Sequence, residues 1–176
     1  ILGYFTTFLL GFVLILAAAG IAAGNGAIQK ARKITTLNMI YSFETATNGF
    51  FTDNGYMPLK GSADTILDTD HAPEVLHTLL GSDGGGGLNP QQIKYLQLKS
   101  GTGGKSGLTY HPDGSLIGCF DSWGNPLHVA FDLDSNETLT VPGRSGTPVT
   151  LNGRRVAVWS DGPDGKSGTA DDVTTW

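Results

Sequence analysis

The N-terminal part of this sequence lacks residues that would interrupt or crosslink a helix. No proline precedes Pro58, no charged residue precedes Lys30, and the only cysteine among the 176 residues is Cys119. A single cysteine cannot form a disulfide within the chain, so a buried thiol is its expected state. An uncharged stretch without proline permits one unbroken helix, which we predict from about residue 2 to 52.

Acidic residues are also missing at this end of the chain. Three of the 11 basic residues (Lys30, Arg32 and Lys33) precede Ile34, whereas none of the 16 acidic residues does. The remainder therefore carries 8 basic and 16 acidic residues, a formal charge of −8. Phosphate binding requires basic patches, so this acidic part argues against a nucleic-acid partner.

Sequence motifs of enzymes are missing as well. There is no glycine-rich nucleotide-binding motif after a predicted strand, no G-x-S-x-G around Ser122 or Ser160, and no His-x-x-x-His zinc motif. We therefore expect no enzymatic activity. The four histidines are expected to be surface residues rather than metal ligands: His71, His77, His111 and His128.

What the chain does have is an apolar stretch from Ile1 to Ala23. About 20 such residues span the hydrocarbon core of a bilayer as a helix. A signal peptide has a shorter apolar region that follows a basic segment, and neither feature is present. A helix that is apolar on every side must be buried on every side, by lipid or by copies of itself. An ordinary single-span anchor stays open as an alternative.

Basic residues flank this stretch on its C-terminal side, at Lys30, Arg32 and Lys33. Basic flanks normally stay in the cytoplasm, which would place the rest of the chain there. The rule fails if a charged leader before Ile1 once fixed the orientation. We expect such a leader, removed by processing, because the chain begins with Ile rather than Met.

Apolar residues then recur in steps of three and four, the pattern of a helix that packs one face on a domain. Gly55 is expected to end this helix in a left-handed conformation, with Pro58 just beyond it. A helix over residues 2 to 52 would be roughly 75 Å long. The predicted apolar face consists of Ile34, Leu37, Ile40, Tyr41, Phe43, Ala46, Phe50 and Phe51.

Short elements are predicted beyond the helix. Pro73 suits the first turn of a short helix that Asp70 caps and Gly81 ends. Alternating apolar and polar residues predict strands around 127–133, 139–141, 149–151 and 156–159. The predicted fold class is therefore α+β. A long N-terminal helix, hydrophobic in its first half and amphipathic in its second, packs on a small antiparallel sheet.

These patterns divide the chain into two parts. Residues 1–27 form a hydrophobic transmembrane or filament-core helix, and residues 28–176 form a globular domain. Within the domain we expect the amphipathic half of the helix at 28–52 and a loop region with short helices at 53–120. Antiparallel strands and an acidic C-terminal loop follow at 121–176.

The C-terminal loop concentrates negative charge among glycines. It holds four aspartates and one lysine: Asp161, Asp164, Asp171, Asp172 and Lys166. Carboxylates that are forced together repel one another, and a hard cation relieves this repulsion through oxygen ligands. We predict a calcium ion held by the side chains of Asp164, Asp171 and Asp172. Backbone carbonyls between Lys166 and Thr169 would complete its ligands; a solvated acidic loop is the alternative.

Four segments resemble type IV pilin-like proteins, most closely the major pseudopilin of type II secretion systems. The helix end FFTDNGYMP and the segment DSWGNPLHVAF, which begins at Asp121, are similar to family motifs. The C-terminal WSDGPDGKSGTADDV is similar to the glycine- and aspartate-rich loop that binds calcium in major pseudopilins. The segment NPQQIKYLQL, which begins at Asn89, resembles a segment of many bacterial members. The resemblance implies the pilin or pseudopilin fold.

The resemblance also implies a function. The chain would be a structural subunit of an extracellular helical filament, a pilus or pseudopilus, built from many copies. The subunit would first reside in a bacterial inner membrane, where a prepilin peptidase would cleave it. Assembly machinery would then add it to a periplasmic or cell-surface filament. Calcium would stabilise the C-terminal loop.

Two positions at the N-terminus are the processing and assembly positions that the resemblance implies. The family usually begins with an N-methylated Phe and has Glu at the fifth position, where this chain has Ile1 and Phe5. An unpaired charge in an apolar bundle is expensive. The amine of Ile1 therefore needs another acceptor, a modification or a place outside the apolar core.

Two other interpretations stay open. Some tip subunits of the family also lack that glutamate, so the chain fits a minor or tip pseudopilin. A solitary membrane-anchored calcium-binding domain would need only lipid around residues 1–23, and it predicts monomers in detergent and no fibres on cells. The triplet Asn136-Glu137-Thr138 matches the N-glycosylation pattern, which often arises by chance.

Overall fold

The structure is a computed structural model that describes the backbone of residues 2–82 and 87–176. Side chains are described for residues 24–82 and 87–176. The chain divides into two compact units, one that ends at Ile34 and one that comprises Thr35–Trp176. It is an α+β protein with one long N-terminal helix and small antiparallel sheets, which confirms the predicted fold class.

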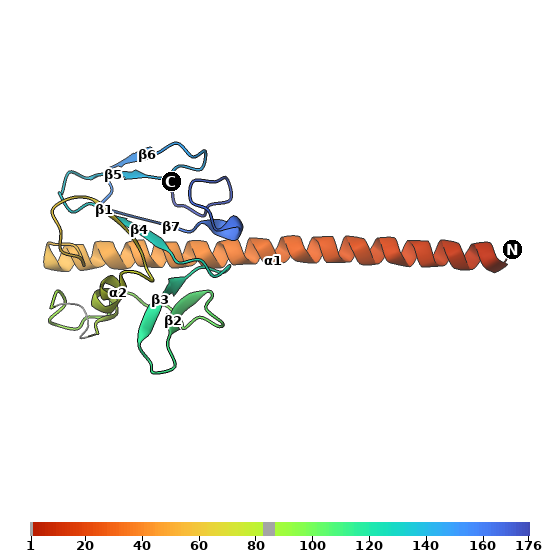
Figure 1. Ribbon diagram of the computed structural model, residues 1–176, viewed down its shortest axis with the longest axis horizontal. Coiled ribbons are helices and arrows are strands. Elements are labelled where there is room, and N and C mark those ends of the chain that lie inside the picture. Colours follow the sequence, from red (N-terminus) through yellow and green to blue (C-terminus); the bar gives the residue numbers. More distant parts are fainter. Residues whose placement is uncertain (1, 83–86) are drawn as a thin grey trace. The chain divides into compact units, whose positions relative to one another are not determined.

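Short elements follow the long helix α1, Leu2–Asn54 (Figure 1). They are β1 (Thr65–Asp68), α2 (Pro73–Leu80), β2 (Gly107–Tyr110), β3 (Leu116–Phe120), β4 (His128–Phe131), β5 (Thr138–Val141), β6 (Val149–Asn152), β7 (Val156–Trp159) and the 3-10 helix η1 (Gly162–Asp164). The strands form antiparallel sheets β1-β4-β7, β2-β3 and β5-β6. The four predicted strands are confirmed as β4 to β7. The expectation of one sheet is wrong, and β1, β2 and β3 lie in the region expected to hold only loops and short helices.

Helix α1, Leu2–Asn54, is continuous, as the absence of proline predicted. Gly55 follows it with a φ of +76°, and its backbone N–H donates to the carbonyl of Phe51 at 2.8 Å. Glycine adopts this left-handed conformation without the steric cost that a Cβ atom would add. The predicted end of the helix at Gly55 is therefore confirmed.

The sequence predicts no membrane span other than the apolar N-terminal segment. Within residues 24–82 and 87–176, no helix is both long enough and apolar enough to cross a bilayer. The predicted membrane segment, Ile1 to Ala23, lies outside the residues whose side chains are described.

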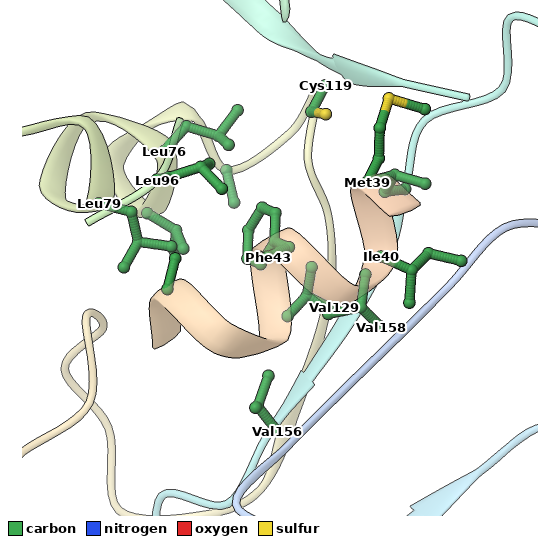
Figure 2. Packing of buried hydrophobic residues seen from close by; sticks show 14 of the residues in the cluster. Met39, Ile40, Phe43, Leu76, Leu79, Leu96, Cys119, Val129, Val156 and Val158 are labelled. Carbon is green, nitrogen blue, oxygen red and sulfur yellow. The ribbon is translucent and has the colours of Figure 1, made fainter. Parts of the chain in front are cut away.

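In the domain, one face of α1 is buried, as its periodicity predicted. Ile40, Phe43 and Phe50 are fully buried, and Phe43 lies between the leucines of α2 and the valines of β4 and β7 (Figure 2). Two residues of the predicted face lie outside it, since Ile34 and Tyr41 are each 51% exposed. The buried stripe instead includes three residues that the apolar pattern did not select: Thr36, Met39 and Thr47.

The sheet β1-β4-β7 is buried on both faces where β4 and β7 pair. Side chains alternate between the two faces of a strand. Val156 and Val158 of β7 join the core around α1, whereas Ala157 and Trp159 face the β5-β6 hairpin. Trp159 is 1% exposed, so the end of β7 is anchored firmly just before the C-terminal loop begins.

Helix α2 shows how the local sequence and the structure differ at a helix start. Its first residue is Pro73, as predicted, and Gly81 ends it with a φ of +70°. The residue before Pro73 is Ala72, and no side chain caps the helix, so the prediction that Asp70 is the cap is wrong. Asp70 lies two residues too early to reach the free N–H groups of the first turn.

Candidate functional site

The C-terminal loop spans residues 161–172 and is closed by backbone pairing at its base. The N–H of Ser160 donates to the carbonyl of Val173 at 3.1 Å, and the N–H of Val173 donates to that of Ser160 at 2.9 Å. Within the loop, Ser167 Oγ accepts a 3.0 Å hydrogen bond from the indole N–H of Trp159. The loop therefore has a fixed base and one fixed point along its length.

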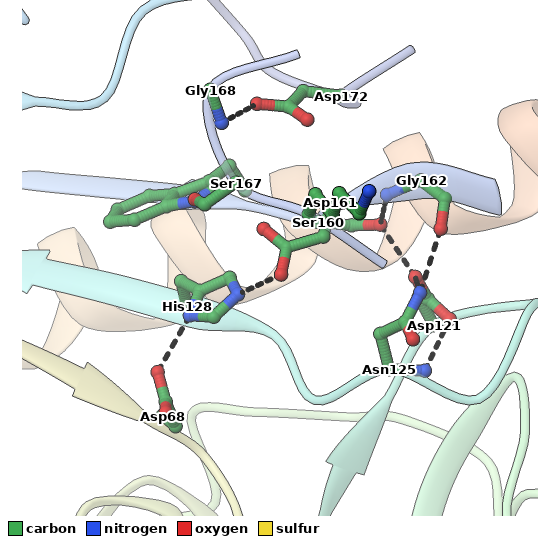
Figure 3. Close-up of polar contacts among 12 residues, drawn as sticks. Asp68, Asp121, Asn125, His128, Ser160, Asp161, Gly162, Ser167, Gly168 and Asp172 are labelled. Carbon is green, nitrogen blue, oxygen red and sulfur yellow. Dashed lines mark hydrogen bonds and ion pairs between the residues drawn. The ribbon is translucent and has the colours of Figure 1, made fainter. Parts of the chain in front are cut away.

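A buried carboxylate, that of Asp121, supports the base of the loop (Figure 3). Its Oδ1 accepts the backbone N–H groups of Trp123, Gly124 and Asn125 at 2.7–2.9 Å. Its Oδ2 accepts the hydroxyl of Ser160 at 2.6 Å. One carboxylate thus shapes the turn before β4 and holds the residue from which the loop departs.

The same turn contacts the first residues of the loop. Asn125 Nδ2 donates to the carbonyl of Gly162 at 2.7 Å, and the N–H of Gly162 donates to Ser160 Oγ at 3.0 Å. Gly162 has a φ of +65°, and a Cβ atom there would collide with the carbonyl oxygen of Asp171. The loop therefore requires glycine at its start, both for its backbone conformation and for space.

His128 forms a second support between two carboxylates (Figure 3). Its Nδ1 lies 2.6 Å from Asp68 Oδ1 and its Nε2 lies 2.8 Å from Asp161 Oδ2. Its ring stacks on that of Trp159 with 5.2 Å between the centroids. Burial lowers the pKa of His128, but the contacts with Asp161 and Asp68 raise it by more, so the pKa lies above its ordinary value.

This arrangement corrects the expectation that all four histidines are surface residues. The side chain of His128 is only 13% exposed. Asp161 is also buried, and its Oδ2 faces the imidazole of His128. Asp68 ends β1, His128 begins β4, and Asp161 lies two residues beyond β7. The sequence does not state which of these strands are neighbours.

Oxygen atoms converge on the hydroxyl of Thr169. Thr169 Oγ1 lies 2.6 Å from Asp171 Oδ1, 3.1 Å from Asp172 Oδ1 and 3.2 Å from the carbonyl oxygen of Lys166. A threonine hydroxyl has one proton, so it can donate to only one of these three acceptors. More acceptor oxygens therefore surround the Thr169 hydroxyl than its single proton can satisfy.

Backbone N–H groups satisfy other carboxylate oxygens of the loop. Gly168 donates to Asp172 Oδ2 at 2.8 Å, and Asp164 donates to Asp171 Oδ2 at 3.1 Å. The carboxylate of Asp164 turns instead to the N–H of Lys166, at 2.9 Å. The hydrogen bond from Thr169 is the main cause that lowers the pKa of Asp171, so this carboxylate stays ionised.

Five loop residues were predicted to bind calcium, and the structure brings four of them together. Lys166, Thr169, Asp171 and Asp172 meet at the threonine hydroxyl, whereas the Asp164 carboxylate faces the backbone of Lys166. The remaining two predicted positions are at the N-terminus. Ile1 and the side chain of Phe5 lie outside the described residues.

Two groups of possible metal ligands elsewhere in the described part of the chain, one of three aspartates and one of two aspartates and a histidine, are packed more closely. Their possible ligand atoms lie within 4.8 Å of one another, which is not the case for Asp164, Asp171 and Asp172 together. The sequence did not single these groups out, because each joins a strand end to a neighbouring turn. They are Asp64, Asp132 and Asp134, and Asp68, Asp70 and His71.

The end of the chain is fastened to α1 through Glu44. Its Oε1 accepts the hydroxyl of Thr175 at 2.9 Å and the backbone N–H of Val158 at 3.2 Å. Burial raises the pKa of Glu44, although these donors and Arg154 favour its charged form. Arg154 also donates to the Thr175 carbonyl at 3.1 Å. The loop is thus held between two fixed segments, β7 and residues 173–176.

Comparison with known proteins adds no relative. No protein-family model matches the chain, and no curated protein or solved structure matches it either.

Proposed function

We propose that the chain is a structural subunit of an extracellular helical filament, a pilus or secretion pseudopilus, with the pilin-like fold. The observation that carries this proposal is helix α1, which is continuous from Leu2 to Asn54. One element therefore joins an uncharged, apolar N-terminal segment to the folded domain. Such a helix can form the spine of a polymer while the domain forms its outer shell.

The apolar segment requires apolar surroundings at every stage. In this proposal, residues 1–27 lie in a bacterial inner membrane before assembly, and a prepilin peptidase processes the subunit there. Assembly machinery then replaces the lipid by the helices of neighbouring copies. Lipid and helix bundle are both apolar, so this exchange costs little hydrophobic free energy and helix packing determines the contact.

Exposed apolar side chains on the described part of α1 favour contact with other copies. Ile28, Ile34 and Tyr41 are each 51–52% exposed. Surface apolar residues are common one at a time, but here they recur along one helix. In a filament, neighbouring copies related by one repeated head-to-tail contact would cover them.

The proposal also includes a calcium ion bound by the C-terminal loop. Calcium binds 6–8 oxygen atoms, and the atoms that crowd the Thr169 hydroxyl are all oxygens. Asp171 and Asp172 would bind through their carboxylates and Lys166 through its carbonyl. Asp164 could join if its carboxylate turned away from the Lys166 N–H. A bound calcium ion would neutralise most of the negative charge that the four aspartates and Lys166 give the loop.

Electron microscopy of material sheared from the cell surface tests this proposal, combined with N-terminal sequencing of its subunits. The expected result is a fibre built from this chain, with residues 1–27 packed together at its centre. Particles in which each copy is isolated, with its apolar segment surrounded by lipid, would contradict the filament. They would favour a solitary membrane-anchored calcium-binding domain instead.

A further inference from the structure

The turn between β4 and β5 contains the triplet Asn136-Glu137-Thr138, which has no part in the filament proposal. Asn136 and Glu137 are exposed, and Thr138 is the first residue of β5. Asparagine followed two residues later by threonine is the acceptor pattern of N-glycosylation, and such acceptors lie in surface loops. The placement of the triplet meets this structural requirement.

The turn brings the two chemically important groups of the triplet together. The backbone N–H of Thr138 donates to Asn136 Oδ1 at 2.7 Å, and the Thr138 hydroxyl donates to the same oxygen. Asn136 Nδ2 donates to Asp134 Oδ2 at 2.9 Å. These partners fix which end of the amide is nitrogen. The amide nitrogen and the threonine hydroxyl are therefore presented on one tight turn, within reach of a single enzyme pocket.

An unusual backbone holds Asn136 at the surface. Its neighbours Ser135 and Glu137 have φ values of +63° and +57°, a backbone conformation that residues other than glycine rarely adopt. The carboxylate of Asp132, which is 2% exposed, accepts the N–H groups of Asn136 at 3.1 Å and of Glu137 at 2.9 Å. The turn is thus fixed from beneath by a buried side chain, and Asn136 itself is not needed in the core.

We propose that Asn136 is an N-glycosylation site whose donor is an oligosaccharide carried on a lipid pyrophosphate. Asn136 Nδ2 forms a bond to the anomeric carbon of the sugar, and the bond between that carbon and the pyrophosphate oxygen breaks. The lipid pyrophosphate leaves with the electron pair, and one amide proton passes to a base of the transferase. The second amide hydrogen remains available to Asp134, so the turn can keep its shape around the glycan.

The same contacts would also serve a turn that carries no sugar, because asparagine often closes turns through its own side chain. Three variants separate the two roles. Asn136→Asp keeps the oxygen that accepts from Thr138 but removes the amide nitrogen. Thr138→Val removes the hydroxyl at nearly constant size, and Thr138→Ser keeps it. Tryptophan fluorescence during unfolding checks that each variant is folded.

The test uses the full chain purified from the cells that naturally produce it. Mass spectrometry of the peptide that contains Asn136 should find sugar on this residue in the natural chain and in Thr138→Ser. The sugar should be lost in Asn136→Asp and Thr138→Val. An unmodified Asn136 in the natural chain, or an added mass that persists in Asn136→Asp, overturns the proposal. Fibres seen by electron microscopy with unmodified Asn136 would defeat this proposal alone and leave the filament proposal intact.

Discussion

Asp121 is the single residue whose structural role is clearest. Its buried carboxylate accepts hydrogen bonds from three backbone N–H groups and from the Ser160 hydroxyl. Asp121→Ala would leave these buried or partly buried donors without an acceptor, at about 1–3 kcal/mol for each fully buried one. We therefore expect the free energy of unfolding to fall by at least about 3 kcal/mol. Urea unfolding followed by tryptophan fluorescence measures this loss.

A matched control is Asp113, which also accepts from backbone and hydroxyl. It accepts the N–H and the hydroxyl of Ser115, at 2.9 and 2.6 Å, but it lies on an exposed turn. Water can replace the carboxylate there, so Asp113→Ala should change the stability little. Equal losses for Asp113→Ala and Asp121→Ala would contradict the role given to burial.

His128 makes the stability depend on pH in a definite direction. Its folded pKa lies above the ordinary value of 6.5, because Asp161 and Asp68 outweigh the effect of burial. The charged imidazole therefore stabilises the fold fully below the unfolded pKa, and this contribution is lost as pH rises through the folded pKa. We expect the free energy of unfolding to decrease as pH rises above about 6.5, as measured by urea unfolding at a series of pH values.

Two variants identify the source of this pH dependence. His128→Gln removes the titrating group between Asp68 and Asp161, so the decrease above neutral pH should become smaller. His111→Gln, at an exposed position, should keep the decrease. The assignment to His128 fails if both variants show the same slope as the natural chain.

At the scale of elements, strand register explains why these contacts could not be predicted. Asp68 pairs with His128 across β1 and β4, and His128 pairs with Trp159 across β4 and β7. Asp161 follows two residues after Trp159, which places its carboxylate beside the same imidazole. The alternation of β4 was enough to predict a strand, but it carries no information about which strand lies next to it.

The sequence did not predict β1, β2 and β3, and in β3 a residue type that is rare in strands serves a contact with a distant segment. In β3, Gly118 reads as a loop residue, yet a Cβ atom there would lie 2.9 Å from Asp70 Cα. The glycine thus permits close backbone approach within a strand. Helix α1 was predictable because its periodicity and the cap at Gly55 are local. Pairing partners and close approaches are not local, so β1, β2 and β3 were missed.

The C-terminal loop yields a prediction about metal binding. Calcium at 100 times its dissociation constant would stabilise the fold by about 2.7 kcal/mol. For a domain of this size that raises Tm by about 5–10 °C. Asp172→Asn removes a ligand charge while its amide oxygen can still accept the Gly168 N–H, so the rise should largely disappear. Differential scanning calorimetry with calcium and with a chelator measures both effects.

The other acidic groups provide the control for this prediction. Asp134 belongs to the group with Asp64 and Asp132 and is exposed. Asp134→Asn should leave the calcium-dependent rise in Tm unchanged if the loop is the site. The loop assignment would be contradicted if Asp134→Asn abolished the rise while Asp172→Asn preserved it.

At the scale of the whole molecule, folding and assembly should depend on different faces of α1. Phe43 is fully buried in the domain, whereas Ile34 is 51% exposed. Removing an exposed apolar side chain costs the monomer little, but it removes apolar area that a filament would bury. Ile34→Ser should therefore leave Tm nearly unchanged and reduce the amount of sheared filament recovered from cells, measured by electron microscopy and immunoblotting.

The control for Ile34→Ser is Val149→Ser, which removes a comparable exposed side chain on β6, at 39% exposure. In the proposed filament α1 lies at the centre and the sheets lie in the shell, so Val149→Ser should assemble at the natural level. Equal filament recovery from both variants, with both domains folded, would mean that the exposed part of α1 makes no contact between copies. Contact between copies would then rest on other parts of the chain, and the exposed side chain of Ile34 would have no part in assembly.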